Sequence, residues 1–190
     1  MISLTNSRSH LNTTFSSQLN LLALLAICGS LIAAFYYQIV FNEIPCPLCQ
    51  LQRVALTLAG IGMLLNIRFG ASNIHYAMIL ASALVGAATS LRQILLHIAP
   101  GDAGYGSALF GLHFYTWGFI SFVVMMVFCA LMLCIDRQSN KQPNRGASGV
   151  IVTAVIALFF ALAAANTVSS VMVCKFGPCP DNPTQYLWKF

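Results

Sequence analysis

The chain has 190 residues, of which 58% are hydrophobic and only 7% carry a charge, and its mean hydropathy is +0.80. A soluble domain carries about 25% charged residues, so this composition excludes an ordinary soluble protein and indicates a multi-pass protein of the lipid bilayer. The net charge of +5 is explained by basic loops on one side of a membrane. No basic and aromatic patch supports binding to nucleic acid.

Five apolar stretches have about the length that a helix needs to cross a bilayer, roughly 20 residues. They predict an all-α transmembrane bundle that forms one integral membrane domain. The first stretch is too long for the apolar part of a signal peptide and lacks an A-x-A cleavage site, so we expect an uncleaved helix. The predicted membrane-spanning segments cover residues 19–41, 50–67, 74–98, 112–135 and 149–173, and a tail covers residues 174–190.

Basic residues of the predicted loops indicate the orientation of the bundle. Five of them fall on one side of the five-helix arrangement, and the positive-inside rule assigns that side to the cytoplasm. Only Lys175 and Lys189 flank the helices on the other side. We therefore expect a cytoplasmic N-terminus and an outer C-terminal tail. The five residues are Arg8, Arg68, Arg137, Lys141 and Arg145.

A Cys-x-x-Cys sequence, Pro45-Cys46-Pro47-Leu48-Cys49, lies where a short polar turn meets the second apolar stretch. Proline is tolerated in the first turn of a helix, which predicts a helix that begins near Pro47. Cys49 would then lie in the first turn, where free N–H groups and the helix dipole favour a thiolate, and Arg53 would add its charge one turn later. We predict a redox-active pair with a low pKa at Cys49. The alternative is that Cys46 and Cys49 are small apolar residues at a helix start.

A second pair, Cys174 and Cys179, follows the fifth predicted helix. An even number of predicted helices separates the two pairs, so both should lie on the outer face of the membrane, where disulfides persist. The second pair could exchange with the first or form a structural disulfide. The four cysteines could instead bind a structural zinc ion, but zinc thiolates are typical of reducing compartments, so we predict no metal. We expect the other three cysteines, Cys28, Cys129 and Cys134, to be packing residues within helices.

Two arginines and a histidine are candidates for a ligand pocket beside the first pair. Arg53 and Arg92 fall within predicted helices, where a charge is costly and suggests a function. Both lie toward the outer ends of their helices, so they could share one pocket with the dithiol; the alternative is that they reach the lipid headgroups. His97, one turn after Gln93, could carry a proton or be merely solvated.

The Cys-x-x-Cys sequence, followed by Gln52 and Arg53, resembles the signature of the DsbB family. Members of this family are membrane thiol–quinone oxidoreductases. The order of the first four predicted helices is also similar to that of the family. So is the segment of residues 111–117 at the start of the fourth predicted helix. The resemblance implies a bacterial inner membrane location, a periplasmic DsbA-like thioredoxin-fold partner, and a membrane quinone, either ubiquinone or menaquinone, as the electron acceptor. It also implies that Cys49 faces the quinone, that Arg53 supports the thiolate and a quinone oxygen, and that Cys46 exchanges with a second pair. His97 corresponds more loosely to a histidine on the quinone side.

The chain departs from the family pattern in its second cysteine pair. In that pattern the pair lies in a long outer loop between the third and fourth helices, whereas the loop here is short and has no cysteine. Cys174 and Cys179 after an additional helix could replace it, so the expected architecture is a four-helix DsbB-like core with one extra helix. Two other functions stay open: a reaction of the vitamin K epoxide reductase type, and a non-catalytic membrane protein with a structural disulfide or zinc site.

Overall fold

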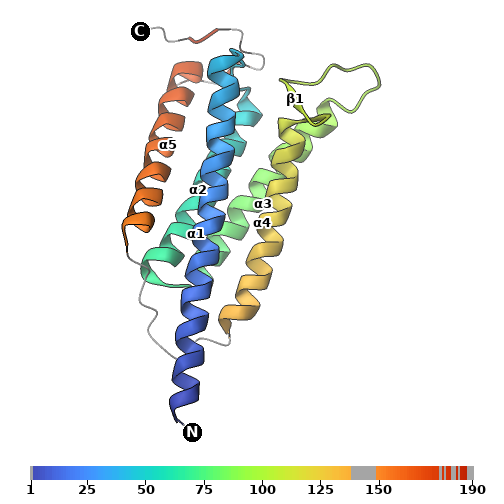
Figure 1. Ribbon diagram of the computed structural model, residues 1–190. Helices are drawn as coiled ribbons and strands as arrows, with labels where there is room; N and C mark the ends of the chain where they lie inside the picture. Colours follow the sequence, from blue (N-terminus) through green and yellow to red (C-terminus); the bar gives the residue numbers. More distant parts are fainter. Residues whose placement is uncertain are drawn as a thin grey trace.

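The computed structural model describes residues 2–137 and 149–175, together with residues 177, 179, 180, 183 and 185–187 of the tail. Lys141, Arg145 and Lys189, which contribute to the expected orientation, lie outside these residues. The described chain forms five long helices and one short β-hairpin (Figure 1). The helices are α1 (Ile2–Val40), α2 (Pro47–Phe69), α3 (Asn73–Leu96), α4 (Phe114–Arg137) and α5 (Val150–Cys174), and the strands are β1 (Ala108–Leu109) and β2 (Leu112–His113).

Each of these helices contains a segment long and apolar enough to cross a membrane, which confirms the predicted fold class of a multi-pass helical bundle. The first helix is longer than its apolar stretch: it begins at Ile2, and its membrane-length part begins at Phe15. No proline or glycine interrupts the sequence before Gly29, so the polar N-terminal residues can continue the helix. The second helix begins at Pro47, the position predicted from the prolines.

The connection between α3 and α4 contains a hairpin that the sequence did not predict. β1 and β2 pair in antiparallel fashion, with Leu109 opposite Leu112, and Phe110 and Gly111 form the turn with φ values of 52° and 79°. A two-residue hairpin turn of this kind requires positive φ at both positions, and glycine supplies it without strain. Trp117 Nε1–H donates a hydrogen bond of 3.0 Å to the carbonyl of Leu109, which fixes the hairpin to the start of α4.

Helices α1 to α4 form a core, and α5 packs on its outside. Within the core α1 packs against α2, α2 against α3, and α3 against α4, whereas α5 contacts α1 and α2 (Figure 1). Glycines allow close approach, because a Cβ at Gly60 would overlap the ring of Phe159 and a Cβ at Gly86 would overlap the ring of Phe122. Such small residues are typical of helix contacts in membranes. The arrangement is therefore a four-helix core with one extra helix.

A polar cluster joins the four core helices at the end of the bundle away from the hairpin. Asn20 donates to the Tyr76 hydroxyl (3.0 Å), Tyr76 donates to the Asp136 carboxylate (2.8 Å), and Asn66 donates to Asn20 Oδ1 (3.1 Å). We name these four residues the clamp cluster, because α1, α2, α3 and α4 each contribute one of them. Asn20, Asn66 and Tyr76 are buried, and buried hydrogen bonds of this kind are costly to leave unmade. The cluster therefore holds the four helices together at this end.

Candidate redox site

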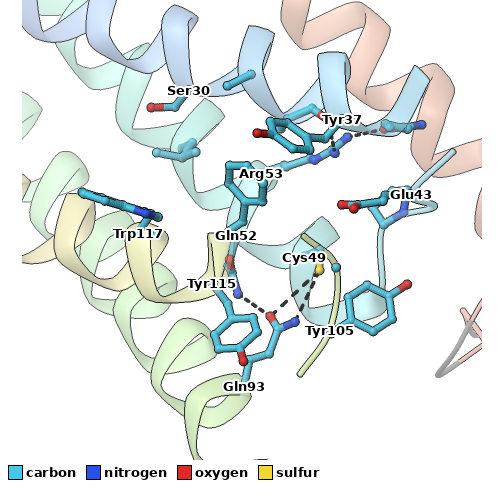
Figure 2. A pocket seen from close by; sticks show the side chains of 18 of the residues that line it. Ser30, Tyr37, Glu43, Cys49, Gln52, Arg53, Gln93, Tyr105, Tyr115 and Trp117 are labelled. Carbon is cyan, nitrogen blue, oxygen red and sulfur yellow. Dashed lines mark hydrogen bonds between the residues drawn. The ribbon is translucent and has the colours of Figure 1, made fainter. Parts of the chain in front are cut away.

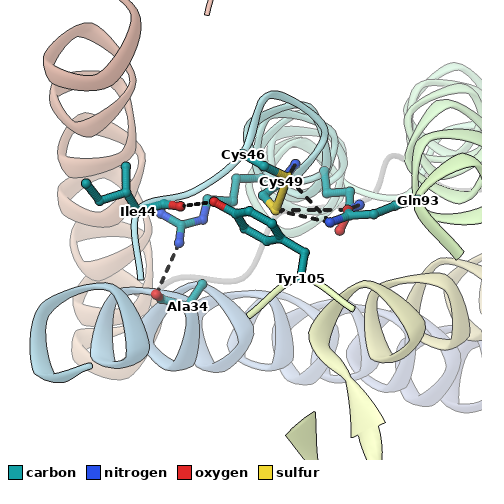
Figure 3. Close-up of a disulfide and its surroundings, with 8 residues drawn as sticks. Ala34, Ile44, Cys46, Cys49, Gln93 and Tyr105 are labelled. Atoms are coloured by element: carbon teal, nitrogen blue, oxygen red, sulfur yellow. Dashed lines mark hydrogen bonds between the residues drawn. A yellow bond between two sulfur atoms is a disulfide. The ribbon is translucent and has the colours of Figure 1, made fainter. Parts of the chain in front are cut away.

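Cys46 and Cys49 form a disulfide at the start of α2 (Figure 3). Cys46 is the N-cap residue with an extended backbone, and its sulfur accepts a hydrogen bond of 3.1 Å from the backbone N–H of Cys49. Pro47 occupies the first helical turn, where its missing N–H removes no helical hydrogen bond. Cys49 therefore lies in the first turn, at the positive end of the helix dipole. The side chain of Cys46 is only 5% exposed, whereas Cys49 is half-buried.

A cavity of about 320 Å³ lies next to the disulfide, between the four core helices and the loop before α4 (Figure 2). Cys49 lines this cavity and Cys46 does not. Pockets for small ligands have volumes of roughly 300–1,000 Å³ and are mainly apolar with a few polar groups, and this cavity has that character. Its polar lining includes Gln38, Glu43, Gln52, Arg53 and Gln93, and its apolar lining includes Leu56, Leu109, Phe114 and Phe122.

Arg53 lines the same cavity and is 8% exposed. Its guanidinium donates to Gln38 Oε1 (2.6 Å) and to the carbonyl of Ala34 (3.1 Å), both on α1, and it lies 5.2 Å from the ring centre of Phe35. In the described part of the chain, no carboxylate forms an ion pair with Arg53. A buried cation held only by neutral groups favours an electron-rich ligand at this cavity wall.

Gln93 of α3 contacts both sulfurs of the disulfide (Figure 3). Its Nε2 lies 3.4 Å from Cys46 Sγ and 3.5 Å from Cys49 Sγ. Its Oε1 accepts a hydrogen bond of 2.9 Å from Gln52 Nε2. The disulfide thus has an amide donor beside it in addition to the backbone N–H of Cys49.

The loop before the hairpin places Tyr105 next to the disulfide (Figure 3). The Tyr105 hydroxyl donates a hydrogen bond of 2.6 Å to the carbonyl of Ile44, two residues before Cys46. The Glu43 carboxylate accepts from the backbone N–H of Ser107 (2.9 Å) and from its hydroxyl. Burial, and then the nearby Glu43, raise the pKa of Tyr105, so its phenol stays protonated and able to donate.

The structure places His97 beside the cavity and not in its lining. His97 caps the C-terminus of α3, its Nδ1 lies 3.2 Å from the Asp102 carboxylate, and its ring stacks on Tyr115 at 5.8 Å. Tyr115 lines the cavity, so the ring of Tyr115 connects His97 to the cavity wall. The backbone N–H of Gly104, and then His97, lower the pKa of Asp102.

Arg92 does not share the pocket with the dithiol, contrary to the expectation from the sequence. It lies on the exposed face of α3 and does not line the cavity. The physical reason is helical geometry: Arg92 precedes Gln93 by one residue and therefore lies about 100° around the helix from it. Gln93 occupies the position toward the disulfide. The exposed position of Arg92 suits contact with water or lipid headgroups.

The second pair, Cys174 and Cys179, also forms a disulfide, at the end of α5. Cys174 is buried with Val173 against Ile44, and Cys179 and Tyr186 pack on this group. The two disulfides therefore lie at the same end of the bundle. The four cysteines form two disulfides here and not a four-thiolate cluster. Of the remaining cysteines Cys28 and Cys129 are buried as expected, whereas Cys134 is exposed.

The tail reaches the redox site through one buried glutamine. Gln38 Nε2 donates to the Tyr186 hydroxyl (3.0 Å) and to Ser169 Oγ (2.8 Å), and its Oε1 accepts from Arg53. Sequence reasoning assigned no role to Gln38, and it quoted Gln52 and Gln93 only as neighbours of other residues. The signal that could have found them is their polarity, because an amide inside a predicted membrane helix needs a partner.

Comparison with known proteins agrees with this arrangement. The family model described as "Disulfide bond formation protein DsbB" matches residues 16–132, which run from α1 into α4. Proteins named "Disulfide bond formation protein B" are 38% identical over 85 residues in Hahella chejuensis (43% of this chain, 52% of the relative) and 43% identical over 82 residues in Pseudomonas syringae pv. tomato (40% and 48%). The relative in Burkholderia pseudomallei is 33% identical over 98 residues (49% and 58%).

These matches leave part of the chain without a counterpart. The aligned region spans about half the length of the curated relatives, and the family match ends before α5 and the second disulfide. No solved structure gives a significant match. The five apolar helices make the protein an integral membrane protein, and because the family model covers more than half of the sequence and includes both Cys46 and Cys49, the chain belongs to the DsbB family.

Proposed function

We propose that this protein is a membrane thiol–quinone oxidoreductase that reoxidises a periplasmic DsbA-like thioredoxin-fold protein and passes the electrons to a membrane quinone. The observation that carries the proposal is that Cys49 of the Cys46–Cys49 disulfide opens onto a cavity whose wall contains the buried Arg53. Membership in the DsbB family supports it. The outcome of this activity is the formation of disulfide bonds in other proteins.

The cavity wall has the chemistry to hold a quinone ring. A quinone has flat apolar faces and two carbonyl acceptors, and the wall offers apolar side chains such as Leu56 and Phe122 together with N–H donors on Arg53 and Gln52. A bound ubiquinone or menaquinone would supply an acceptor for two electrons and two protons. In the proposal, Arg53 binds a quinone oxygen and stabilises negative charge there.

Electrons reach the site by thiol exchange. A thiolate of the second pair attacks Cys46 Sγ, a new S–S bond forms to Cys46, the Cys46–Cys49 bond breaks, and its electron pair leaves on Cys49 Sγ. The position of Cys49 in the first turn of α2 stabilises this thiolate. The reduced DsbA-like partner opens the Cys174–Cys179 disulfide in the same way. The packing of Cys174 against Ile44 supports this order, because Ile44 is two residues from Cys46.

We further propose that the protein lies in the bacterial inner membrane with its N-terminus in the cytoplasm and both disulfides in the periplasm. The location of both disulfides at one end of the bundle supports this orientation, because disulfides persist in oxidising compartments. The DsbA-like partner belongs to the same compartment, so it can reach the second pair without crossing the membrane.

The test is quinone reduction by the purified protein in detergent, with a reduced DsbA-type dithiol as the electron donor. Wild type should turn over, and Cys49→Ser should lose turnover because no thiolate forms beside the cavity. Cys134→Ser, which changes a free exposed cysteine, is the matched control and should keep full activity. Absence of turnover in wild type, with quinone and donor both varied, would overturn the proposal.

A double variant, Cys174→Ser with Cys179→Ser, tests the order of exchange. Loss of turnover with the protein donor supports the relay from the tail to Cys46. Full turnover would show that the tail disulfide is structural and that the partner reaches Cys46 directly. Neither outcome decides whether the protein is a thiol–quinone oxidoreductase, because that question is answered by wild type and Cys49→Ser.

A further inference from the structure

Gln93 is an amide that is only 2% exposed, and its polar atoms face partners on two sides. Its Nε2 is within hydrogen-bond distance of both disulfide sulfurs, at 3.4 Å and 3.5 Å. Its Oε1 accepts from Gln52 Nε2 at 2.9 Å. Gln93 Oε1 also lies 3.9 Å from Cys49 Sγ, so the nitrogen is the end of the amide nearer to both sulfurs. In this arrangement the Gln93 oxygen accepts from Gln52, and the Gln93 nitrogen is directed to the sulfurs.

We propose that Gln93 is a catalytic residue of the thiol exchange and that Gln52 is its positioning residue. When a thiolate bonds to Cys46 Sγ and the Cys46–Cys49 bond breaks, the electron pair leaves on Cys49 Sγ, and Gln93 Nε2–H donates to the thiolate so formed. This inference rests on the proposed function, because it concerns the thiol step of that reaction.

The contact favours the charged state over the resting state. A disulfide sulfur is a weak acceptor, whereas hydrogen bonds to an ionised acceptor are roughly twice as strong as neutral ones. A donor that is already in place and buried costs no reorganisation when the charge forms. Gln93 therefore stabilises the opened form more than the closed form, which makes the disulfide a better oxidant.

Arg53 does not fill this role in the described residues. Its guanidinium donates to Gln38 and to the Ala34 carbonyl on α1, and the side-chain N–H donor found at Cys49 Sγ is that of Gln93. The two residues thus divide the site: the amide faces the sulfurs, and the cation faces the cavity wall on α1. This division separates the thiol step from the quinone step.

The experiment measures the redox equilibrium of the Cys46–Cys49 disulfide with glutathione, without quinone or DsbA-type partner, and quantifies each disulfide by peptide mass spectrometry. Gln93→Met should require about a tenfold higher ratio of reduced to oxidised glutathione for half-reduction. Gln52→Met, which keeps Gln93 but frees its orientation, should show a smaller shift, about threefold. Both changes should also shift the alkylation of the reduced Cys49 thiol to higher pH.

Two controls separate this role from packing. Gln50→Met changes a buried glutamine of α2, the helix that also contains Gln52. The Gln50 side chain accepts a hydrogen bond from Ser170 of α5 and does not contact the sulfurs, so this variant should leave the redox equilibrium unchanged. The Cys174–Cys179 disulfide of each variant is an internal reference and should not shift. If Gln93→Met does not fold, the Gln52→Met shift relative to Gln50→Met decides the question.

Equal equilibria for wild type, Gln93→Met and Gln52→Met would overturn the proposal, and so would an equal shift in Gln50→Met. Because no quinone takes part, a failure here is distinguishable from a failure of the proposed function. If wild type reduces quinone but the redox equilibrium of its disulfide does not depend on Gln93, the proposed function stands and Gln93 has no role in the thiol step.

Discussion

The two ends of the four-helix core both contain buried polar side chains, but they use them differently. In the clamp cluster, Asn20, Asn66, Tyr76 and Asp136 bond to one another across all four helices. At the disulfide end, Gln52, Gln93 and Arg53 surround a cavity. Polar groups that satisfy one another close an end of the bundle, whereas polar groups that face a cavity and a disulfide are available to a ligand or a reaction.

Buried polar atoms without a hydrogen-bond partner add to this contrast. Gln50 Nε2, Ser90 Oγ and Asn166 Oδ1 are buried near this half of the helices without a hydrogen-bond partner among the described residues, whereas Ser17 Oγ is such an atom near the clamp cluster. Unpartnered buried polar atoms cost free energy. The disulfide end is therefore less well satisfied than the clamp cluster, as is common where a site is built for function rather than for stability.

The largest effect that separates the two ends is expected for Arg53→Met. It removes the buried cation from the cavity wall, and quinone reduction should fall by about 100-fold, since removing one stabilising group from a charge-stabilising site costs about that much. The measurement is the rate of quinone reduction with saturating reduced donor. Arg92→Met is the matched control, because Arg92 is exposed and outside the cavity; equal losses in both variants would contradict a role for the cavity wall.

An intermediate effect, on stability instead of activity, is expected for Tyr76→Phe in the clamp cluster. The change removes hydrogen bonds to Asn20 and Asp136, and leaving buried partners unsatisfied should lower the free energy of unfolding by about 1–3 kcal/mol. Thermal unfolding in detergent measures this loss. Tyr36→Phe, at an exposed tyrosine of α1, should be neutral, and turnover per folded molecule should stay normal in both. Lost turnover in folded Tyr76→Phe would mean that the two ends are coupled.

The smallest effect concerns the loop that covers the disulfide end. The Gly104 N–H and His97 lower the pKa of Asp102, so the ionised carboxylate stabilises the folded loop. This contribution is complete above the ordinary carboxyl pKa of about 3.9 and is lost as the pH falls through the lower pKa of the folded state. The protection of the Gly104 N–H against hydrogen exchange, relative to its intrinsic rate at each pH, should therefore fall below about pH 4, and Asp102→Asn should abolish that change. Identical acid profiles for the two proteins would remove Asp102 from the control of this loop.

Local features of the sequence predicted much of this structure. The five helices follow from hydropathy, and the start of α2 follows from Pro47, because both depend on neighbouring residues. The return of both cysteine pairs to one end follows from counting the helices between them. These inferences need no knowledge of which helix faces lie against each other.

The contacts within the site could not be predicted in this way, because they depend on the rotation and pairing of helices distant in sequence. Arg53 lies toward Gln38 of α1, and Gln93 rather than Arg92 faces the disulfide. A charge in a membrane helix signals that a partner exists, but it does not say on which helix. The hairpin turn at Phe110 was missed because a non-glycine residue with positive φ is uncommon.

The burial of Cys46 has a consequence for selectivity. Cys46 has 5% of its surface exposed, and Tyr105 is bonded to the backbone of Ile44 beside it, so attack on this sulfur by a thiol in solution is expected to require movement of the loop. We therefore expect the rate of exchange at Cys46 to depend on how often the loop opens. Small thiols are accordingly expected to equilibrate with this disulfide slowly, and a macromolecule that displaces the loop is expected to react with it faster.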